Sequence, residues 1–342
     1  MTRRALTLLL ASVLALGLGA AGSFTKVPYV ALKPGPTCNT LSSCYGEQVL
    51  TFTGASPQAR TGELQLTTVS VQDHLTLLEA LAGWLSPNDA VLPREVVFAP
   101  DQTDEQNQQQ NAEEMTQSQD SASTAALTYL GYKGTSEILV QAITKGAPAE
   151  GKLKAADQIV SVDGTKVTGE DQLRKLISAR KAGQPVTIGF VRGGVDGSVT
   201  ITTAAAPDSS KRAIVGFTPT LQTDFPVKVD IRLKDVGGPS AGLMFALGIV
   251  DKLGKVDLAG NLNVAGTGEI SDDGKVGAIG GIAQKMRGAR AHGATVFLSP
   301  ADNCAEAKKN KPSGITLVRV TTLTSAVDAL AALRRHSAPP SC

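Results

Sequence analysis

The chain has 342 residues, and its hydrophobic content of 42% is enough for two or three domains with packed cores. Its 33 lysines and arginines nearly balance its 31 aspartates and glutamates, which leaves a net charge of +2. This balance gives no support for nucleic-acid binding as a main role, so we expect no nucleic-acid partner.

The N-terminal segment is basic and then apolar. Arg3 and Arg4 precede residues 5–22, which carry no charge. That stretch is short for a membrane-spanning helix and long for the core of a signal peptide. We expect residues 1–23 to be an uncleaved anchor that contacts the membrane, with a cleaved signal as the alternative. The two arginines favour a single-pass orientation with everything after Ser23 outside the cytoplasm.

Four cysteines bear on the compartment of the protein. Cys38, Cys44, Cys304 and Cys342 form no CxxC pair, so we expect no zinc ribbon and no thioredoxin-like site. In an exported chain, Cys38 with Cys44 and Cys304 with Cys342 would make a reasonable disulfide set. Isolated thiols are the alternative, and the spacing does not choose between them.

Residues 24–130 are expected to combine strands, a helix and a polar linker. Three prolines and a glycine in residues 24–45 predict an extended, loop-like stem. Alternation and β-branched residues predict strands over 48–53 and 62–71. Residues 74–85 read as a helix with one apolar face, which carries the only tryptophan, Trp84.

Two polar features of this region are not interpreted as functional sites. His74, at the start of the predicted helix, is interpreted as structural or exposed rather than as a ligand. Residues 101–120 are rich in Gln, Asn, Asp and Glu. They form either a solvated linker or a polar helix, and the composition leaves both open.

Residues 131–206 are predicted to be a compact module with a helix over 171–179. Gly146 to Lys152 matches the start of a phosphate-binding loop, but Leu153 stands where that loop needs Ser or Thr. We therefore expect no nucleotide site. The runs Ala147–Leu153 and Asp157–Gly164 resemble a PDZ domain of the bacterial protease type, although Ala156 stands where that family usually has glycine. The resemblance implies binding of an extended chain end, such as the C-terminus of a substrate, at a sheet edge.

The last domain is expected over residues 214–335. Predicted strands and helices alternate there, which indicates an α/β fold. The strands are expected over 227–233, 263–265, 276–279, 295–298 and 315–320, and the helices over 240–253, 281–292, 301–310 and 324–333. We further hypothesise that the strands and the helix before residue 86 pack with this domain, so that the module at 131–206 is an insertion.

Ser240 is the candidate nucleophile. It follows Gly237, Gly238 and Pro239 and precedes an apolar helix that stops at Gly254. A serine hydroxyl there lies beside free backbone N–H groups and the positive end of the helix dipole, where an oxyanion would be stabilised. The alternative is that Ser240 only caps the helix.

Lys285 is the candidate base. None of the three histidines lies in a motif that suggests a base. On the helix over 281–292, Ile282, Met286 and Ala289 mark an inward stripe, and Lys285 lies on or beside it. A lysine among apolar groups loses hydration, which favours the neutral amine that a general base must have. The alternative is a lysine whose ammonium group reaches water.

Three runs occur in order: Gly238–Gly242, Thr267–Ile270 and Gly280–Lys285. They resemble the proteolytic domain of the Lon (S16) family, which uses a Ser-Lys dyad. With the N-terminal segment and the PDZ-like module, the chain is similar to the YlbL-like branch of membrane-anchored bacterial peptidases. One departure is Gly237, where Lon proteases often have an acidic residue.

The resemblance assigns roles by position. Ser240 would be the nucleophile, Lys285 the base and Thr267 the hydroxyl that orients the amine. The oxyanion hole would come from backbone N–H groups around Gly238, Pro239 and Ala241. No metal and no cofactor is implied, and homo-oligomers are compatible with it because Lon-type domains often form rings of six.

We therefore expect an α/β catalytic domain of the Lon type, a small β-rich PDZ-like domain and an N-terminal transmembrane helix. The expected activity is that of an ATP-independent serine endopeptidase at the bacterial cell membrane, with its catalytic part extracytoplasmic. Its expected partners are protein or peptide substrates. The alternatives are a non-catalytic membrane-tethered PDZ adaptor and an enzyme that acts only on its own chain.

Overall fold

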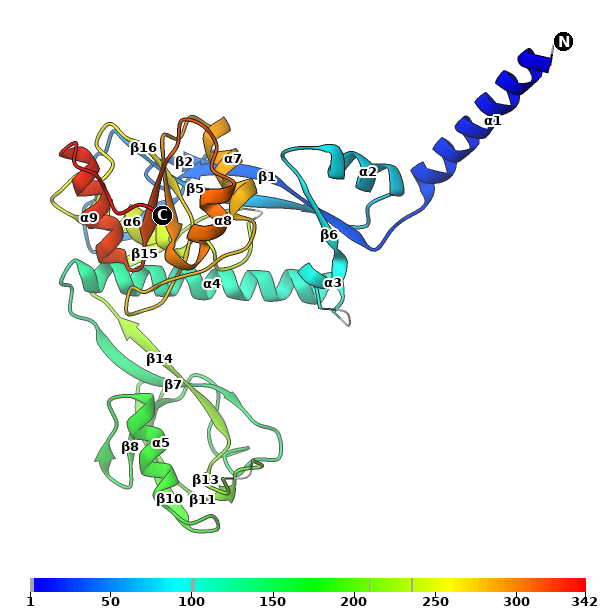
Figure 1. The fold of residues 1–342 in the computed structure, drawn as a ribbon. Helices are drawn as coiled ribbons and strands as arrows, with labels where there is room; N and C mark the ends of the chain where they lie inside the picture. Colours follow the sequence, from blue (N-terminus) through cyan, green and yellow to red (C-terminus); the bar gives the residue numbers. More distant parts are fainter. Residues whose placement is uncertain (1–2, 100–101, 209, 235) are drawn as a thin grey trace. The chain divides into compact units, whose positions relative to one another are not determined.

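The computed structural model describes residues 3–99, 102–208, 210–234 and 236–342 (Figure 1). Residues 1–2 of the expected anchor and residue 101 of the polar stretch lie outside the described residues. The chain divides into two compact units, one made of Met1–Gly131 with Val227–Cys342 and the other of Tyr132–Pro226. The smaller unit is therefore inserted into the larger one, which confirms the insertion hypothesis.

Helix α1 (Arg3–Phe24) covers the apolar N-terminal segment. By length and composition it is the one helix in the described ranges that could cross a membrane, with a mean hydropathy of 2.1 and 6% of its span buried. The helix fits the expected membrane anchor.

The larger unit contains a six-stranded mixed sheet in the order β20-β19-β16-β5-β1-β6. Three strands, β16, β19 and β20, run parallel to one another, and β16 is also parallel to β5. Both chain segments of the unit supply strands to the sheet: β1 (Tyr29–Asn39), β5 (Glu63–Gln72), β6 (Ala90–Pro93), β16 (Asn263–Gly266), β19 (Val296–Pro300) and β20 (Thr316–Val320).

Strand β1 lies where the prolines predicted a loop-like stem, so that prediction was wrong. The strand pairs with β5 on one side and with β6 on the other. Its register shifts between Pro34 and Thr37. Such an irregularity accommodates Pro34 and Pro36, which have no N–H to donate to a ladder. A Cβ atom on Gly35 would lie 2.3 Å from the Thr68 hydroxyl oxygen, so the two strands approach closely there.

Helices α6 (Gly242–Leu253) and α7 (Ile282–Ala291) cover opposite faces of this sheet. Side chains alternate between the faces along a strand. In β16, Ala265 packs in a buried cluster with residues of α7. A Cβ atom on the next residue, Gly266, would point at the Met244 sulfur of α6, 2.7 Å away. Two further helices pack beside these, α8 (Cys304–Lys309) beside α7 and α9 (Leu323–Arg334) beside α6.

The polar stretch is a helix, α4 (Asp104–Tyr129), and not a solvated linker. A capping box formed by Thr103 and Gln106 starts it. Its buried residues are mostly small and recur at helical spacing, so that the helix packs closely on α6 (Figure 1). These buried residues include Met115, Ser118, Ala122, Ala125 and Ala126.

The smaller unit is a β-rich domain, and residues 132–208 and 210–226 contain one helix. Its sheet has the order β11-β10-β8-β7-β14, and β9 (Thr165–Lys166) pairs with β8. The sequence placed the start of the next domain at residue 214. The smaller unit instead extends to Pro226, because strand β14 pairs with its strand β7. The elements are β7 (Thr135–Ile143), β8 (Gln158–Val162), α5 (Glu170–Ser178), β10 (Pro185–Arg192), β11 (Val195–Thr202), β12 (Ala204–Ala205), β13 (Ala213–Ile214) and β14 (Phe217–Asp224).

All four cysteines are paired. Cys38 bonds Cys44, and Cys304 bonds Cys342. This is the set that the sequence suggested for an exported chain. The second bond ties the C-terminal residue to the start of α8.

Candidate active site

The turn that carries Ser240 is held by helix α4. Gly238 has a φ of 81°, which glycine adopts without strain. Its backbone N–H donates to the Asn111 carbonyl oxygen at 2.9 Å. The Ser118 hydroxyl donates to the Pro239 carbonyl oxygen, also at 2.9 Å. Two turns of α4 thus position the backbone before Ser240.

Ser240 does not cap helix α6. The N-cap residue of α6 is Ala241, and no side chain forms a capping hydrogen bond there. The Ser240 hydroxyl therefore does not act as the helix cap that was the alternative to a nucleophile. The Ser240 carbonyl oxygen accepts hydrogen bonds from the Gly268 N–H at 2.9 Å and from the Thr267 hydroxyl at 3.0 Å.

The structure brings Lys285 to Ser240 although the two residues lie 45 positions apart. The Lys285 Nζ atom lies 2.8 Å from Ser240 Oγ and 3.0 Å from Thr267 Oγ1. Lys285 is in the first turn of α7, beside the buried stripe of Ile282 and Met286. Only 3% of its surface is exposed, so its side chain does not reach water as the alternative required.

Burial decides the charge of the Lys285 amine. Loss of hydration lowers its pKa from 10.5 to about 7, and the negative charge of Glu269 opposes this only in part. Burial and the nearby charge of Glu114 in turn raise the pKa of Glu269 above its ordinary value. A large fraction of the Lys285 amine is therefore neutral near pH 7.

The three residues meet at the carboxyl end of strand β16. Thr267 directly follows β16, and Gly266 pairs with Leu66 of the parallel strand β5. The ends of parallel strands are the usual place for a site in an α/β sheet. Helices on opposite faces can both reach this end, so that α6 and α7 bring Ser240 and Lys285 together there.

The backbone donors near Ser240 are fewer than the sequence suggested. The Gly238 N–H is used by Asn111, and Pro239 has no N–H. In the part of the chain that the structure describes, the N–H groups of Ser240 and Ala241 have no hydrogen-bond acceptor. These two donors remain for an oxyanion.

A cavity of about 230 Å³ adjoins the Ser240 hydroxyl. It is large enough for a substrate side chain. Its walls come from strand β5, helix α4, the turn before α6 and helix α7. Its lining residues include Thr67, Thr68, Val69, Met115, Gly237, Ser240, Ala241 and Lys285.

Helix α4 and strand β5 supply site residues that the sequence analysis did not name. Asn111, Met115 and Ser118 come from the stretch whose helical form was left open. Thr67 donates its hydroxyl hydrogen to the Gly266 carbonyl oxygen at 3.1 Å. The capping box at Thr103 was a signal for the helix, but nothing local in the sequence indicates what α4 packs against.

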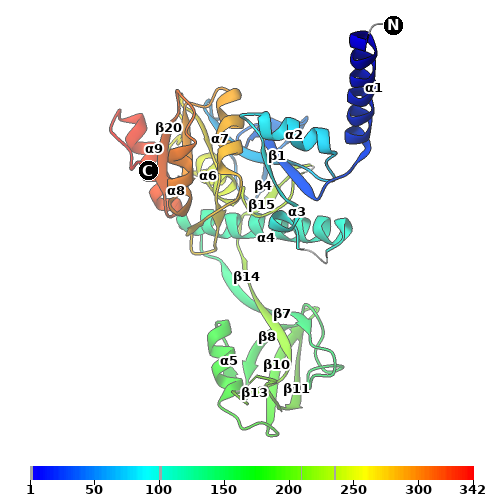
Figure 2. The ribbon, with the colours of Figure 1, turned by 45° about the vertical axis from the view of Figure 1, so that its right-hand side comes forward.

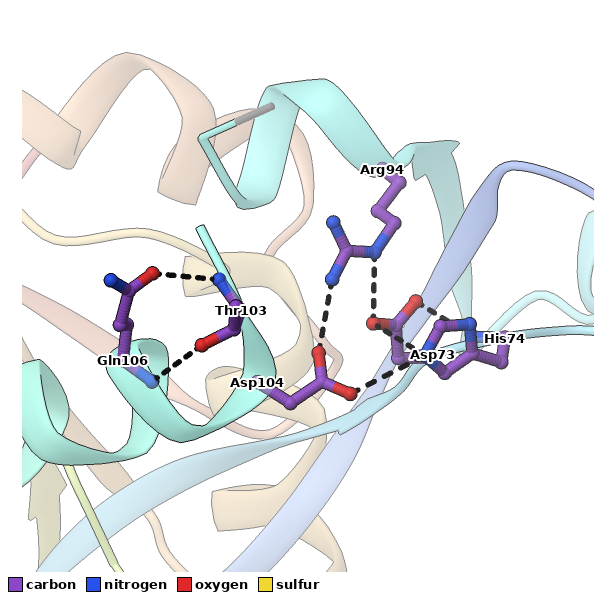
Figure 3. Close-up of polar contacts among 6 residues, drawn as sticks. All are labelled: Asp73, His74, Arg94, Thr103, Asp104 and Gln106. Atoms are coloured by element: carbon purple, nitrogen blue, oxygen red, sulfur yellow. Dashed lines mark hydrogen bonds and ion pairs between the residues drawn. The ribbon is translucent and has the colours of Figure 1, made fainter. Parts of the chain in front are cut away.

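One other cluster has the composition of a metal site. Asp73, His74 and Asp104 could together hold an ion, and no further group of this kind occurs among the described residues. Figure 3 shows that Arg94 already pairs with both carboxylates, at 3.0 Å from Asp73 and 3.1 Å from Asp104. Because one guanidinium bridges the two aspartates, we assign the cluster the structural role of joining the end of β5 to the start of α4.

An α/β unit with a serine, a buried amine and free N–H donors at the end of its parallel strands has the parts that a serine hydrolase requires. Residues 209–331 match the family model of the Lon protease (S16) C-terminal proteolytic domain, and residues 108–203 match that of the PDZ domain. The chain thus carries a proteolytic domain of the Lon type and a PDZ domain, behind an apolar helix that fits a membrane anchor. This combination indicates a protease that also binds peptides or proteins.

Searches of curated proteins and of solved structures add less about the family than the two family models do. A search of curated proteins found no match. Among solved structures, the PDZ domain of an SdrC-like protein from Listeria monocytogenes is 24% identical, covers 24% of this chain and 86% of that chain, and has a TM-score of 0.23. The PDZ domain of an SdrC-like protein from Listeria innocua is also 24% identical, with coverages of 24% and 92% and a TM-score of 0.23.

Proposed function

We propose that the protein is an ATP-independent serine endopeptidase in which Ser240 is the nucleophile and Lys285 the general base. One observation carries the proposal: the buried Lys285 Nζ atom lies 2.8 Å from Ser240 Oγ. That distance is within reach of proton transfer. The family match to a proteolytic domain supports peptide bonds as the substrate.

Thr267 sets the direction of the hydrogen bonds. Its hydroxyl donates to the Ser240 carbonyl oxygen, so its oxygen is an acceptor towards the amine. A neutral Lys285 can give one N–H to Thr267 and keep its lone pair for the Ser240 hydroxyl hydrogen. This orientation is the one that a general base needs.

The reaction then proceeds in two halves. Lys285 takes the proton of Ser240 while Oγ attacks the peptide carbonyl carbon, and the oxyanion lies at the N–H groups of Ser240 and Ala241. The ammonium group returns the proton to the leaving amine, and an acyl-enzyme forms. Water attacks the acyl carbon with Lys285 again as the base. The C–Oγ bond then breaks, Lys285 returns the proton to Ser240 Oγ, and a carboxylic acid leaves.

The low pKa makes this chemistry available near neutral pH. With a pKa of about 7, roughly half of the Lys285 amine is neutral at pH 7. An ordinary lysine with a pKa of 10.5 would be neutral at pH 7 in only about one molecule in 3,000. Burial therefore increases the population of the active base by about a thousandfold.

The test is cleavage of a flexible protein such as casein. We expect Ser240→Ala and Lys285→Met to lower kcat/KM by at least about a thousandfold, as removal of one member of a catalytic pair does. Ser42→Ala and Lys308→Met, both at exposed positions, serve as matched controls and should keep wild-type turnover. If the wild type and all four variants cleave casein equally, the Ser-Lys dyad is not the catalyst. If none of them cleaves casein, the result favours a non-catalytic PDZ adaptor.

We further propose that the PDZ domain recruits the substrate. A groove of about 320 Å³ lies between α5 and the segment from β13 to β14. Leu173, Ile177 and Phe217 give it apolar walls, and its charged lining residues are Arg174, Arg212 and Glu170. This chemistry fits an apolar chain end with a C-terminal carboxylate.

A peptide with a free C-terminus should bind this groove more tightly than its amidated form, and Arg174→Ala with Arg212→Ala should reduce that preference. Cleavage of a short peptide that needs no recruitment should be unchanged in the same double variant. A double variant that binds both peptides as the wild type does would exclude this groove.

We propose an extracytoplasmic location for both units. Two disulfides suit an oxidising compartment, and Arg3 and Arg4 precede the apolar helix. Protease added to intact cells should digest the chain after Ser23. Full protection would reverse the proposed orientation.

A further inference from the structure

Helix α2 (Leu77–Leu85) buries small residues and exposes large apolar ones, which is the reverse of an ordinary surface helix. Its two buried residues are small, Ala80 and Gly83. A Cβ atom on Gly83 would lie 2.5 Å from Val91 of β6, so the helix sits close against the sheet there. The large apolar residues point outwards, with exposed fractions from 40% to 86%: Leu77, Leu78, Leu81, Trp84 and Leu85.

These five residues, called the α2 face below, form one continuous stripe. Their spacing along the helix is the spacing of a single face. An exposed apolar surface of this kind on an otherwise soluble unit marks a contact site. Trp84 is fixed within the face by an edge-on contact with Tyr29, with ring centroids 5.3 Å apart.

The α2 face continues directly from helix α1. The Leu77 N–H donates to the Thr25 carbonyl oxygen at 2.9 Å, and the Val27 N–H donates to the Leu75 carbonyl oxygen at 2.8 Å. Gly22, in the last turn of α1, is so close to Leu78 that an added Cβ would lie 3.2 Å from its side chain. Figures 1 and 2 both show α2 beside the C-terminal end of α1.

We propose that the α2 face lies in the membrane surface on the side where the C-terminal end of α1 emerges. If α1 spans the bilayer, the backbone hydrogen bonds at residues 25–27 hold α2 at the level of the lipid headgroups. Leucines with a tryptophan are the side chains that favour this interface. The proposal rests on α1 as the anchor and is independent of the peptidase activity.

The contact gives the larger unit a second attachment to the membrane. Strand β5 ends at Gln72, shortly before α2, and its residues Thr67 to Val69 line the cavity beside Ser240. The α2 face thereby holds the candidate active site near the lipid surface. Substrate segments that emerge from the membrane would be the ones within its reach.

Trp84 reports on this contact without any labelling, because it is the only tryptophan in the chain. The experiment uses the full chain reconstituted in vesicles of phosphatidylethanolamine and phosphatidylglycerol. We expect Trp84 emission to shift to the blue on reconstitution. Lipids that carry bromine atoms near the headgroup should quench the Trp84 emission at least twofold more than lipids brominated near the acyl chain ends. Acrylamide should quench Trp84 less in vesicles than in detergent.

Two variants sharpen the test. Leu81→Glu with Leu85→Glu changes two exposed positions of the α2 face and should abolish bromine quenching, while the chain still floats with the vesicles through α1. Val256→Glu replaces an exposed apolar residue elsewhere in the larger unit, where 57% of the side chain is exposed, and should leave quenching unchanged.

Three outcomes would overturn the proposal. A floating chain whose Trp84 is open to acrylamide and unquenched by bromines would place the α2 face in water. Protection from acrylamide without bromine quenching would mean that a second copy of the chain covers the face. A chain that does not float with vesicles would refute both the anchor and the surface contact.

Discussion

Replacement of Lys285 by methionine tests the energetic side of the proposed site. The structure implies that this lysine destabilises the folded chain, because folding moves its amine out of water. The pKa falls from 10.5 to about 7. At about 1.4 kcal/mol for each tenfold change, folding disfavours the ammonium form by about 5 kcal/mol.

The pH dependence follows from the sign of that pKa change. Between about pH 7 and 10.5 the unfolded chain binds a proton that the folded chain does not, so the wild-type free energy of unfolding rises with pH across this range. The cost of the buried amine is about 4 kcal/mol at pH 7 and about 2 kcal/mol at pH 9. Below pH 7 it is fully present.

Lys285→Met removes this cost and also two hydrogen bonds, to Ser240 and Thr267, which are worth about 1 kcal/mol each. The variant should therefore be more stable than the wild type by about 2 kcal/mol at pH 7. The difference should shrink with rising pH and disappear near pH 9. Catalytic activity should be lost although stability increases.

Urea unfolding of the detergent-solubilised full chain, followed by Trp84 fluorescence at pH 7, 8 and 9, measures the difference. Trp84 belongs to the larger unit, so the signal reports the unit that contains Lys285. The reasoning fails if the variant is less stable at pH 7, or if its stability depends on pH in the same way as that of the wild type.

Three further substitutions have expected results. Thr267→Val removes the acceptor that orients the amine of Lys285, so kcat should fall by ten- to a hundredfold with KM little changed; a kcat within twofold of wild type would contradict this role. Gly242→Ala should destabilise the larger unit by about 1–3 kcal/mol, because the added Cβ would lie 2.8 Å from the side chains of Ile270 and Ser118. Urea unfolding measures this change, and unchanged stability would show that the first turn of α6 is loosely packed. Asp157→Ala removes the buried carboxylate that accepts hydrogen bonds from the exposed Arg192 guanidinium at 2.6 and 2.7 Å and from the Lys154 N–H, and should destabilise the smaller unit by at least about 1 kcal/mol. Limited proteolysis should then cut the smaller unit first while cleavage of short peptides continues, and simultaneous loss of both would argue against independent units.

The sequence was enough to select Ser240 and Lys285, which the structure places 2.8 Å apart, but not the residues that support them. Ser240 and Lys285 were identifiable because each lies in a short run with a recognisable local geometry. Asn111 and Ser118 were not, because a polar helix has the same composition whether it is solvated or packed on a neighbour. Their contacts with the turn at Gly238 and Pro239 form only once α4 lies on α6.

Strand β1 shows the same limit within the fold. Its prolines were interpreted from the local preference of Pro34 and Pro36 for loops. Pairing with β5 and β6 outweighed that preference, since the register shift accommodates two residues that cannot donate to a ladder.

The sequence by itself determined what depends on neighbours along the chain: the apolar N-terminal helix, the Gly-Gly-Pro-Ser turn, the inward stripe beside Lys285 and the alternation of strands and helices in the last domain. Only the tertiary structure decided that α2 lies against the last turn of α1, that α4 supports the Ser240 turn, and that a buried amine lies 2.8 Å from the serine. The physical reason is that periodicity and turn preference act over a few residues, whereas burial and hydrogen-bond distance arise between residues that only folding brings together.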